Sequence, residues 1–385
     1  MQRKTRDDHL FSSGPKRILS LDGGGIRGIL TVQILARIEE ILRARAGEDA
    51  DFRLADYFDL IGGTSTGAIL AAGLATGRSV AELDQLYRGL GEHVFQNDLF
   101  RQGIFRAKFS ADHLREVLEN EFKDTSLGDE SVRTGLAIVA KRLDTGSPWV
   151  VHNNPRGRYF AARPGGSAVP NADYLVKDVV RASTAAPTYF DPEKISVTAD
   201  LEGAFVDGGV SPHNNPALQL LLLATLEGYG LQWPLGADNI LLVSIGTGAW
   251  ELKLDPDKVM KMTAANLGLR GLASLMDDAA AFNELVLQWL SASATARPID
   301  REVGDLKGDV LGGGAPWLTY LRYNAQLDRD WLKDEAKLEL SAKQVEALRE
   351  MDDPKNMPLL IQVGEAVAGT VKEGDLEARF DIDVQ

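Results

Sequence analysis

The sequence predicts an α/β fold organised around a parallel sheet. Two short apolar strands, Arg17–Leu21 and Phe58–Ile61, each run into a glycine-rich turn that a helical segment follows. After the first turn, apolar residues recur from Leu30 to Leu42 at the three- and four-residue spacing of an amphipathic helix. Strands and helices in alternation indicate a parallel sheet joined by right-handed crossovers.

The length and composition allow one large α/β domain or two ordinary ones. The chain has 385 residues, of which 44% are hydrophobic and 25% charged, a composition that can bury a sizeable core. We expect a flexible tail over residues 1–15, which Gly14-Pro15 ends, and an α/β domain over 16–255. Residues 256–385 are expected to form a mostly helical portion packed on that core.

Charge and residue usage restrict where the protein acts. The net charge is −14, so the surface on average repels nucleic-acid backbones and anionic membranes. The chain has no cysteine, which excludes disulfides, thiol nucleophiles and thiolate metal sites. The first seventeen residues lack the apolar core of a signal peptide, and the longest apolar run, near Leu218–Leu226, is too short to span a bilayer. We therefore expect a cytoplasmic protein that binds no nucleic-acid polymer, and any contact that it makes with the inner face of the membrane when active is expected to be peripheral.

The remaining core elements are predicted from the same patterns. The segment from Val80 to Phe122 is helical, with a break around Asn97–Phe109, and strands at Leu136–Arg142 and Trp149–His152 are expected to pair. The other predicted elements are a surface excursion over 153–173, a helix over Leu175–Ala186, a strand at Ala204–Val206, a helix that begins at Asn215-Pro216, a strand at Ile240–Ile245, helices near 257–292, 341–351 and 357–371, and a strand at Tyr320–Leu327.

The second turn fits the pattern of a nucleophile elbow. Gly63-Thr64-Ser65-Thr66-Gly67 matches G-x-S-x-G, in which a sharp strand-to-helix turn lifts a serine hydroxyl clear of its neighbours. Small residues are needed on both sides because the strained turn leaves no room for side chains. A glycine-rich turn with an N-capping serine would produce the same local pattern, so the elbow needs support from the rest of the chain.

The first turn, Gly23–Gly28, allows two interpretations. It fits G-x-G-x-x-G, the dinucleotide-binding fingerprint, but the ribose-binding acid should close the second strand, which here ends in Gly62-Gly63. Alternatively, consecutive glycine N–H groups at a helix start form a nest that stabilises an oxyanion, worth about 3–4 kcal/mol per donor. Arg27 beside the nest would anchor the loop, assist with negative charge, or form only a structural salt bridge.

A serine nucleophile needs a base, and the histidines supply few candidates. An α/β-hydrolase places its catalytic histidine late in the chain, yet none lies in the last 172 residues. His213, six residues after Asp207, is the alternative base. Asp207 closes a strand and precedes Gly208 and Gly209, which would let a serine approach. Considered by itself, Asp207 would fit the role of a turn-capping residue equally well. An aspartate becomes a useful base when it is partly desolvated. The five histidines are His9, His93, His113, His152 and His213.

Three blocks of the sequence together resemble the signature motifs of patatin-like phospholipases. These are Asp22–Gly28, Gly63–Gly67 and Asp207-Gly208-Gly209, and the resemblance covers about residues 16–250 in family order. Further matching stretches are Arg181–Phe190, Asn214–Ala217 and Val243–Gly248.

The resemblance implies a three-layer α/β/α fold and an acyl hydrolase of phospholipids and related lipids that needs no metal or other cofactor. It implies a catalytic dyad of Ser65 and Asp207. The implied oxyanion-hole residues are Gly23, Gly24, Gly25 and Arg27, and the supporting motif residues are Asp22, Gly28, Gly63, Gly67, Gly208 and Gly209. A non-catalytic lipid-binding or storage protein with a vestigial elbow remains an alternative.

A narrower resemblance concerns size and the segment Tyr320–Asn324, which is similar to bacterial anti-phage patatin effectors that cyclic nucleotides switch on. It implies a cyclic dinucleotide activator, and a homo-oligomer would be compatible with it. Such a ligand would need cations, and the candidates are Arg322 and two basic clusters, Arg101/Arg106/Lys108 and Arg156/Arg158/Arg163.

Overall fold

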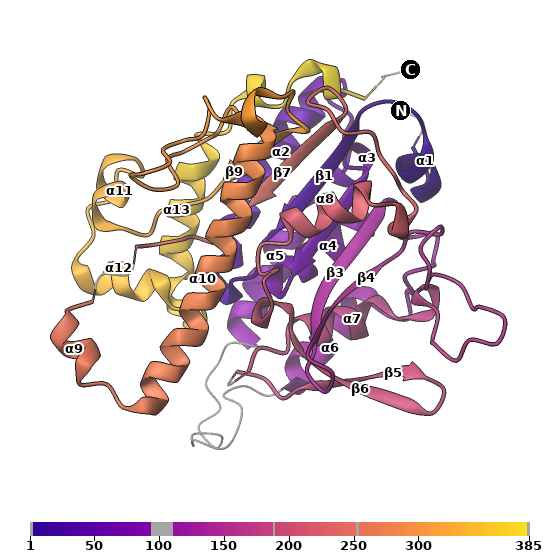
Figure 1. Cartoon of the computed structure of the whole chain (residues 1–385), viewed down its shortest axis with the longest axis horizontal. Coiled ribbons are helices and arrows are strands. Elements are labelled where there is room, and N and C mark those ends of the chain that lie inside the picture. Colours follow the sequence, from indigo (N-terminus) through magenta and orange to yellow (C-terminus); the bar gives the residue numbers. More distant parts are fainter. Residues whose placement is uncertain (1–2, 94–110, 188, 252–253, 383–385) are drawn as a thin grey trace.

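The computed structural model describes residues 3–93, 111–187, 189–251 and 254–382. In this part of the chain, nine strands form one sheet (Figure 1). The strands are β1 (Lys16–Leu21), β2 (Leu60–Thr64), β3 (Gly135–Arg142), β4 (Ser147–His152), β5 (Glu193–Thr198), β6 (Leu201–Asp207), β7 (Ile240–Ile245), β8 (Ser291–Ala292) and β9 (Leu318–Tyr323). Their order is β5-β6-β3-β2-β1-β7-β9-β8, and β4 also pairs with β3.

Helices surround this sheet. The α-helices are α1 (Arg6–Phe11), α2 (Gly28–Arg45), α3 (Leu54–Tyr57), α4 (Thr66–Ala75), α5 (Val80–His93), α6 (Ala111–Phe122), α7 (Val176–Ser183), α8 (Ala217–Thr225), α9 (Pro256–Met260), α10 (Ala264–Leu290), α11 (Arg329–Asp334), α12 (Ala342–Arg349) and α13 (Met357–Ala368). None of these helices is long and apolar enough to cross a membrane.

The central strands β1, β2, β7 and β9 are buried on both faces, as is typical of strands in a parallel sheet that helices cover on both sides. Alternate residues of one strand enter different cores: Leu19 packs with α2, α4, α5, α7 and α13, whereas Ile18 packs with α1, α8 and the C-terminal end of α10. β1 lies between β2 and β7 and runs parallel to both. The three-layer α/β/α fold with a mainly parallel sheet is therefore confirmed.

The sheet is mixed beyond β3, and this arrangement positions the site. On one edge of β3, parallel β2 ends with Thr64 opposite Val139, and antiparallel β6 ends with Asp207 opposite the next residue, Ala140. Antiparallel β4 covers the other edge of β3, as the predicted pairing of these two strands requires. The ends of β2 and β6 thus approach each other head-on along a single strand. The parallel arrangement expected for the sheet does not extend to the strand that Asp207 closes, because β6 runs antiparallel to β3.

The N-terminal segment is not a flexible tail throughout. Thr5 and Asp8 form a capping box for α1, and His9 and Leu10 are buried. The His9 ring contacts the buried carboxylate of Asp59 at 2.9 Å. The prediction of a flexible tail is wrong for Arg6–Phe11, which forms a capped helix. The sequence did not reveal this helix because six residues are too few to show apolar periodicity.

The C-terminal portion completes the sheet rather than only covering it. β9 pairs in parallel with β7, so the sheet crosses the boundary expected at residue 255. α13 packs on α2, where Gly364 lies against the Leu30 carbonyl. The helix expected near 257–292 is divided into α9 and α10, and Thr263 caps the second. The break expected around Asn97–Phe109 lies in the part of the chain that the structure does not describe.

Candidate active site

The turn between β2 and α4 has the geometry of a nucleophile elbow. Ser65 has φ 56° and ψ −128°, a strained conformation for a residue with a side chain. A Cβ on Gly63 would lie 2.1 Å from the Gly67 carbonyl oxygen, and one on Gly67 would lie 2.3 Å from the Leu21 carbonyl oxygen. Both glycines of the motif are therefore required by close backbone contacts.

Ser183, at the end of α7, holds the elbow in place. Its hydroxyl accepts a hydrogen bond from the Ser65 N–H at 2.9 Å and donates one to the Val139 carbonyl at 2.6 Å. Ser183 thereby ties the elbow to β3. The sequence shows it only as one residue of the stretch Arg181–Phe190, and its positioning role is visible only in the folded chain.

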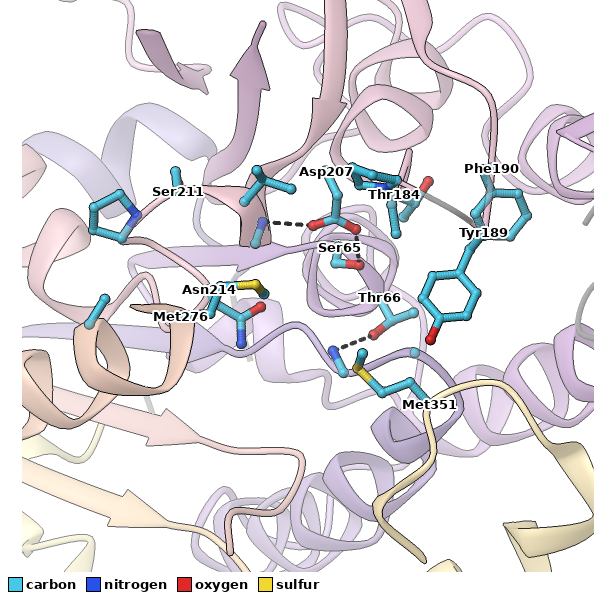
Figure 2. A pocket seen from close by; sticks show the side chains of 18 of the residues that line it. Ser65, Thr66, Thr184, Tyr189, Phe190, Asp207, Ser211, Asn214, Met276 and Met351 are labelled. Atoms are coloured by element: carbon cyan, nitrogen blue, oxygen red, sulfur yellow. Dashed lines mark hydrogen bonds between the residues drawn. The ribbon is translucent and has the colours of Figure 1, made fainter. Parts of the chain in front are cut away.

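The Ser65 hydroxyl donates a hydrogen bond of 2.5 Å to Oδ2 of Asp207 (Figure 2). The other carboxylate oxygen accepts the Gly209 N–H at 2.7 Å, so the turn after β6 fixes the carboxylate. Asp207 is only 3% exposed, and this burial raises its pKa to about 6, against the opposing effect of the hydrogen bonds from Ser65 and Gly209. The structure thus brings together the two residues of the predicted dyad.

The alternative base, His213, is not aligned with the serine. Its backbone carbonyl accepts a hydrogen bond from the Thr64 hydroxyl at 2.6 Å, and no hydrogen bond joins its ring to Ser65 or Asp207 in the described structure. Among the described residues, no histidine lines the cavity that contains Ser65. The geometry favours Asp207 over His213 as the base.

The backbone N–H groups of the glycine loop have different partners. Gly23 donates to the Asn214 carbonyl at 3.1 Å, and Ile26 donates to the Met351 carbonyl at 2.8 Å. Gly24 makes only a long contact of 3.3 Å with the Thr66 hydroxyl, and Gly25 has no partner among the described residues.

Gly24 and Gly25 line the cavity beside Ser65. Their N–H groups are therefore available to an anionic group beside Ser65, whereas the Asn214 carbonyl occupies the N–H of Gly23. The remaining glycines of the motifs lie at the start of α2 (Gly28) and in the turn after β6 (Gly208, Gly209).

Arg27 lies behind the glycine loop and does not line the cavity. Its guanidinium stacks on the Trp250 ring at 4.9 Å, and its Nε donates a hydrogen bond to the Gly24 carbonyl at 3.4 Å. Burial lowers the pKa of Arg27 to about 10, which leaves it charged at neutral pH. This arrangement fits the predicted anchoring role rather than direct contact with an oxyanion.

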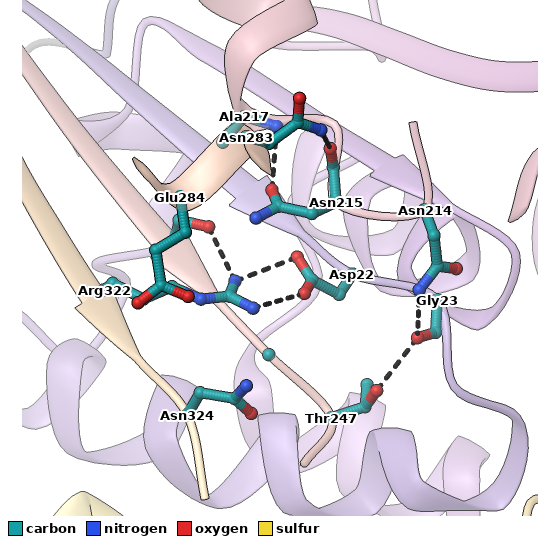
Figure 3. A network of polar contacts seen from close by, with 12 residues as sticks. Asp22, Gly23, Asn214, Asn215, Ala217, Thr247, Asn283, Glu284, Arg322 and Asn324 are labelled. Atoms are coloured by element: carbon teal, nitrogen blue, oxygen red, sulfur yellow. Dashed lines mark hydrogen bonds and ion pairs between the residues drawn. The ribbon is translucent and has the colours of Figure 1, made fainter. Parts of the chain in front are cut away.

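Asp22, the first residue of the glycine loop, is held by a residue 300 positions away (Figure 3). The Arg322 guanidinium, on β9, forms two hydrogen bonds with the Asp22 carboxylate, at 3.0 and 2.6 Å, and a third with the Ser244 hydroxyl at 2.8 Å. Both charged side chains are buried. Arg322 was one of the candidate cations for a cyclic dinucleotide, and the structure places its guanidinium in a buried ion pair with Asp22 instead.

One of the two basic clusters lies within the described residues. Arg101, Arg106 and Lys108 lie outside the described residues. In the other cluster, the Arg156 guanidinium lies 3.9 Å from the centre of the Phe11 ring, and that of Arg158 lies 5.8 Å from the Tyr159 ring. Their role as ligands of an activator stays a prediction.

Replacing Arg322 by Met is expected to destabilise the protein strongly. It leaves the Asp22 carboxylate buried without its partner, which costs about 3–5 kcal/mol. Urea unfolding monitored by circular dichroism measures the loss. The double variant Arg322→Met/Asp22→Asn, which removes the buried charge as well, should recover part of it. Unchanged stability of the single variant would contradict the structural role of the pair.

The cavity above Ser65 has a volume of about 910 Å³ and an apolar lining. Ser65, Asp207, Gly24 and Gly25 are among the residues that line it. The Asn214 side chain adds a polar group that sequence reasoning noted only as part of a motif. The apolar lining residues include Ile69, Leu90, Leu114, Phe190, Val210, Leu275, Met276, Phe282 and Met351. In the described residues, no group of three or more acidic or histidine side chains could hold a metal ion. The space fits an acyl chain that reaches the serine.

Comparison with known families agrees with this geometry. The family described as "Patatin-like phospholipase" matches residues 19–221, just over half of the chain. The chain belongs to the patatin-like phospholipase family. The dinucleotide-binding interpretation of the glycine loop is therefore wrong, and in this chain Gly24 and Gly25 line the same cavity as Ser65.

Several proteins are similar to this patatin-like chain. A cGAMP-activated phospholipase of Escherichia coli is 34% identical over 250 residues, which cover 64% of this chain and 65% of that protein. A cGAMP-activated phospholipase of Vibrio cholerae is 31% identical over 66% of this chain and 70% of that protein. Patatin group J-1 of Solanum tuberosum is 32% identical over 60% of each chain. These alignments cover between 60% and 70% of each relative, so 30% to 40% of each relative stays unmatched.

Proposed function

We propose that this protein is an acyl hydrolase that cleaves fatty-acyl esters of membrane phospholipids with a dyad of Ser65 and Asp207. The observation that carries the proposal is the 2.5 Å hydrogen bond from Ser65 Oγ to Asp207 Oδ2 beside a large apolar cavity. Membership of a phospholipase family supports the substrate class. Contact with the inner face of the membrane would be peripheral.

In the first half of the reaction, the Ser65 oxygen attacks the ester carbonyl and Asp207 accepts the serine proton. The Gly24 and Gly25 N–H groups stabilise the negative charge that develops on the carbonyl oxygen. When the tetrahedral intermediate collapses, the ester C–O bond breaks and the lysophospholipid leaves with the proton from Asp207. The acyl group remains esterified to Ser65 in the apolar cavity.

In the second half, a water molecule attacks the acyl-enzyme and Asp207 accepts its proton. The bond between the acyl carbon and Ser65 breaks, the serine regains a proton, and the fatty acid is released. Burial makes Asp207 a stronger base than an ordinary aspartate, whereas a pKa near 6 leaves it ionised at neutral pH.

The pH dependence of the reaction is expected to report Asp207. With a pKa raised to about 6, kcat/KM for a neutral short-chain ester should be constant above pH 7 and fall as the carboxylate is protonated, to about a tenth at pH 5. Initial rates between pH 4.5 and 8.5 measure the profile. A midpoint at or below pH 4 would contradict a desolvated carboxylate base.

The direct test of the function uses phospholipid vesicles as substrate. The purified protein should release free fatty acid and lysophospholipid, identified by mass spectrometry, and the Ser65→Ala protein should release neither. Failure of the unaltered protein to react with a fluorophosphonate probe would favour the alternative, a non-catalytic lipid-binding or storage-type homologue.

We further propose that a cyclic dinucleotide switches the hydrolase on, as in anti-phage defence. The support is similarity to two bacterial cGAMP-activated phospholipases. The vesicle assay is run with cGAMP, with a panel of other cyclic dinucleotides, and without nucleotide. Stimulation by one of them is the expected result, and equal rates in all samples would refute regulation without affecting the assignment of the dyad.

A further inference from the structure

α9 and the first turns of α10 form a surface element beside the cavity. In Figure 1 this part of the chain extends beyond the layers of the fold. Two of its apolar side chains are open to solvent: Met260 is 84% exposed and Leu267 is 45% exposed. An ordinary surface helix would turn such residues toward a core.

The exposed apolar face continues to the mouth of the cavity. Leu275 and Phe282, two helical turns apart on α10, are 64% and 62% exposed and also line the cavity. Val210, in the turn after β6, lines the cavity as well and is 39% exposed. Apolar side chains from two separate elements therefore surround the opening through which a substrate reaches Ser65.

The charge of this element is opposite to that of the protein. Residues 258–276 contain three cationic residues, Lys258, Lys261 and Arg270, and no acidic one, whereas the whole chain carries −14. All three cations are exposed, and none forms an ion pair within the described residues. Acidic residues flank the segment, with Asp257 before it and Asp277 after it.

We propose that residues 258–276 and the apolar cavity rim dock the protein on a phospholipid bilayer that contains anionic lipids. The inference rests on the proposed function and adds which face meets the membrane. Met260, Leu267, Leu275 and Phe282 enter the interface between headgroups and acyl chains, and the three cations pair with lipid phosphates. The cavity mouth then opens into the layer that holds the ester carbonyl.

A second copy of the chain fits this face less well than a bilayer does. In a symmetric dimer the same surface lies on both sides of the contact, so the three cations of one copy would face the three cations of the other. Their like charges would repel each other. A bilayer offers negative charge and an apolar layer together. Because the average charge of the protein opposes anionic membranes, this local patch also decides the orientation of binding.

The test is vesicle flotation in the Ser65→Ala background, which keeps the lipid intact and makes binding independent of hydrolysis. Vesicles of phosphatidylcholine with about 30% phosphatidylglycerol supply the negative surface. The assay is run with and without cGAMP. The apolar variant is Met260→Ser/Leu267→Ser, and the charge variant is Lys258→Ser/Lys261→Ser/Arg270→Ser. Neither variant alters a residue that lines the cavity.

A matched control is Leu143→Ser/Leu201→Ser, which removes two similarly exposed leucines, 54% and 50%, at the antiparallel end of the sheet. The parent and the control should float. The partition coefficient should fall about 10-fold for the apolar variant and about 100-fold for the charge variant. With Ser65 restored, both variants should hydrolyse a soluble short-chain ester at the rate of the unaltered protein.

Equal flotation of parent and variants, or no flotation of the parent in either condition, would overturn the docking inference and leave the dyad untouched. If light scattering without vesicles shows a lower mass for the variants than for the parent, the face is an interface between two copies of the chain. That result would also overturn the docking inference. Loss of short-chain hydrolysis by the unaltered protein would refute the proposed function, while flotation would still report on the docking face.

Discussion

Ser65→Ala is expected to lower kcat/KM for a soluble nitrophenyl ester by at least about 10⁴-fold. The substitution removes the only atom that attacks the ester carbonyl in the proposed reaction. It leaves the oxyanion donors and the cavity in place, so substrate binding should change little. Steady-state hydrolysis and labelling by a fluorophosphonate probe measure the loss.

The fold should survive this substitution, which makes the result interpretable. Alanine carries the same backbone strain at φ 56° as serine does, and the loss of the hydrogen bond to Asp207 costs about 1 kcal/mol. Circular dichroism and thermal unfolding of the Ser65→Ala protein serve as controls. Substantial hydrolysis by a folded Ser65→Ala protein would show that the nucleophile is elsewhere.

Asp207→Asn is expected to lower kcat/KM by about 10⁴-fold, because the amide has nearly the shape of the carboxylate but cannot accept the serine proton. The amide oxygen can still accept the Gly209 N–H, so the turn after β6 should keep its geometry. The rate that remains should no longer titrate near pH 6, since the group that causes this titration is gone. The same nitrophenyl assay, run over the pH range, measures both effects.

His213→Ala is the matched comparison for the base. The His213 ring makes no hydrogen bond to Ser65 or Asp207 in the described structure, and the interaction of His213 with Thr64 uses its backbone carbonyl. Activity should therefore be retained. If His213→Ala inactivates the protein and Asp207→Asn does not, the base is the histidine and the proposed dyad is incorrect.

The local features of the site were predictable from the sequence because each depends on neighbouring residues. Gly63 and Gly67 mark the elbow because backbone atoms approach them too closely for a side chain. Asp207 followed by two glycines marks a turn that can meet a serine. The strand Ile240–Ile245 was predicted at its observed bounds, because a buried parallel strand is a continuous apolar run.

Other features were not predictable because each depends on what the fold places beside a residue. The N–H of Gly23 cannot bind an oxyanion because it donates its hydrogen bond to the Asn214 carbonyl. Arg322 looked like a ligand for an anionic activator, yet it is buried against Asp22. Six-residue α1 carries too little pattern to be distinguished from a tail.

Patterns of neighbouring residues were enough to predict the α/β fold class, the elbow serine, the glycine nest and Asp207 as the candidate base. How these parts meet depends on the tertiary structure. Ser65 and Asp207, 142 residues apart, come together because β2 and antiparallel β6 end head-on along one edge of β3. Strand pairing joins residues distant in sequence, and no local pattern of side chains specifies the direction in which a distant strand will pair.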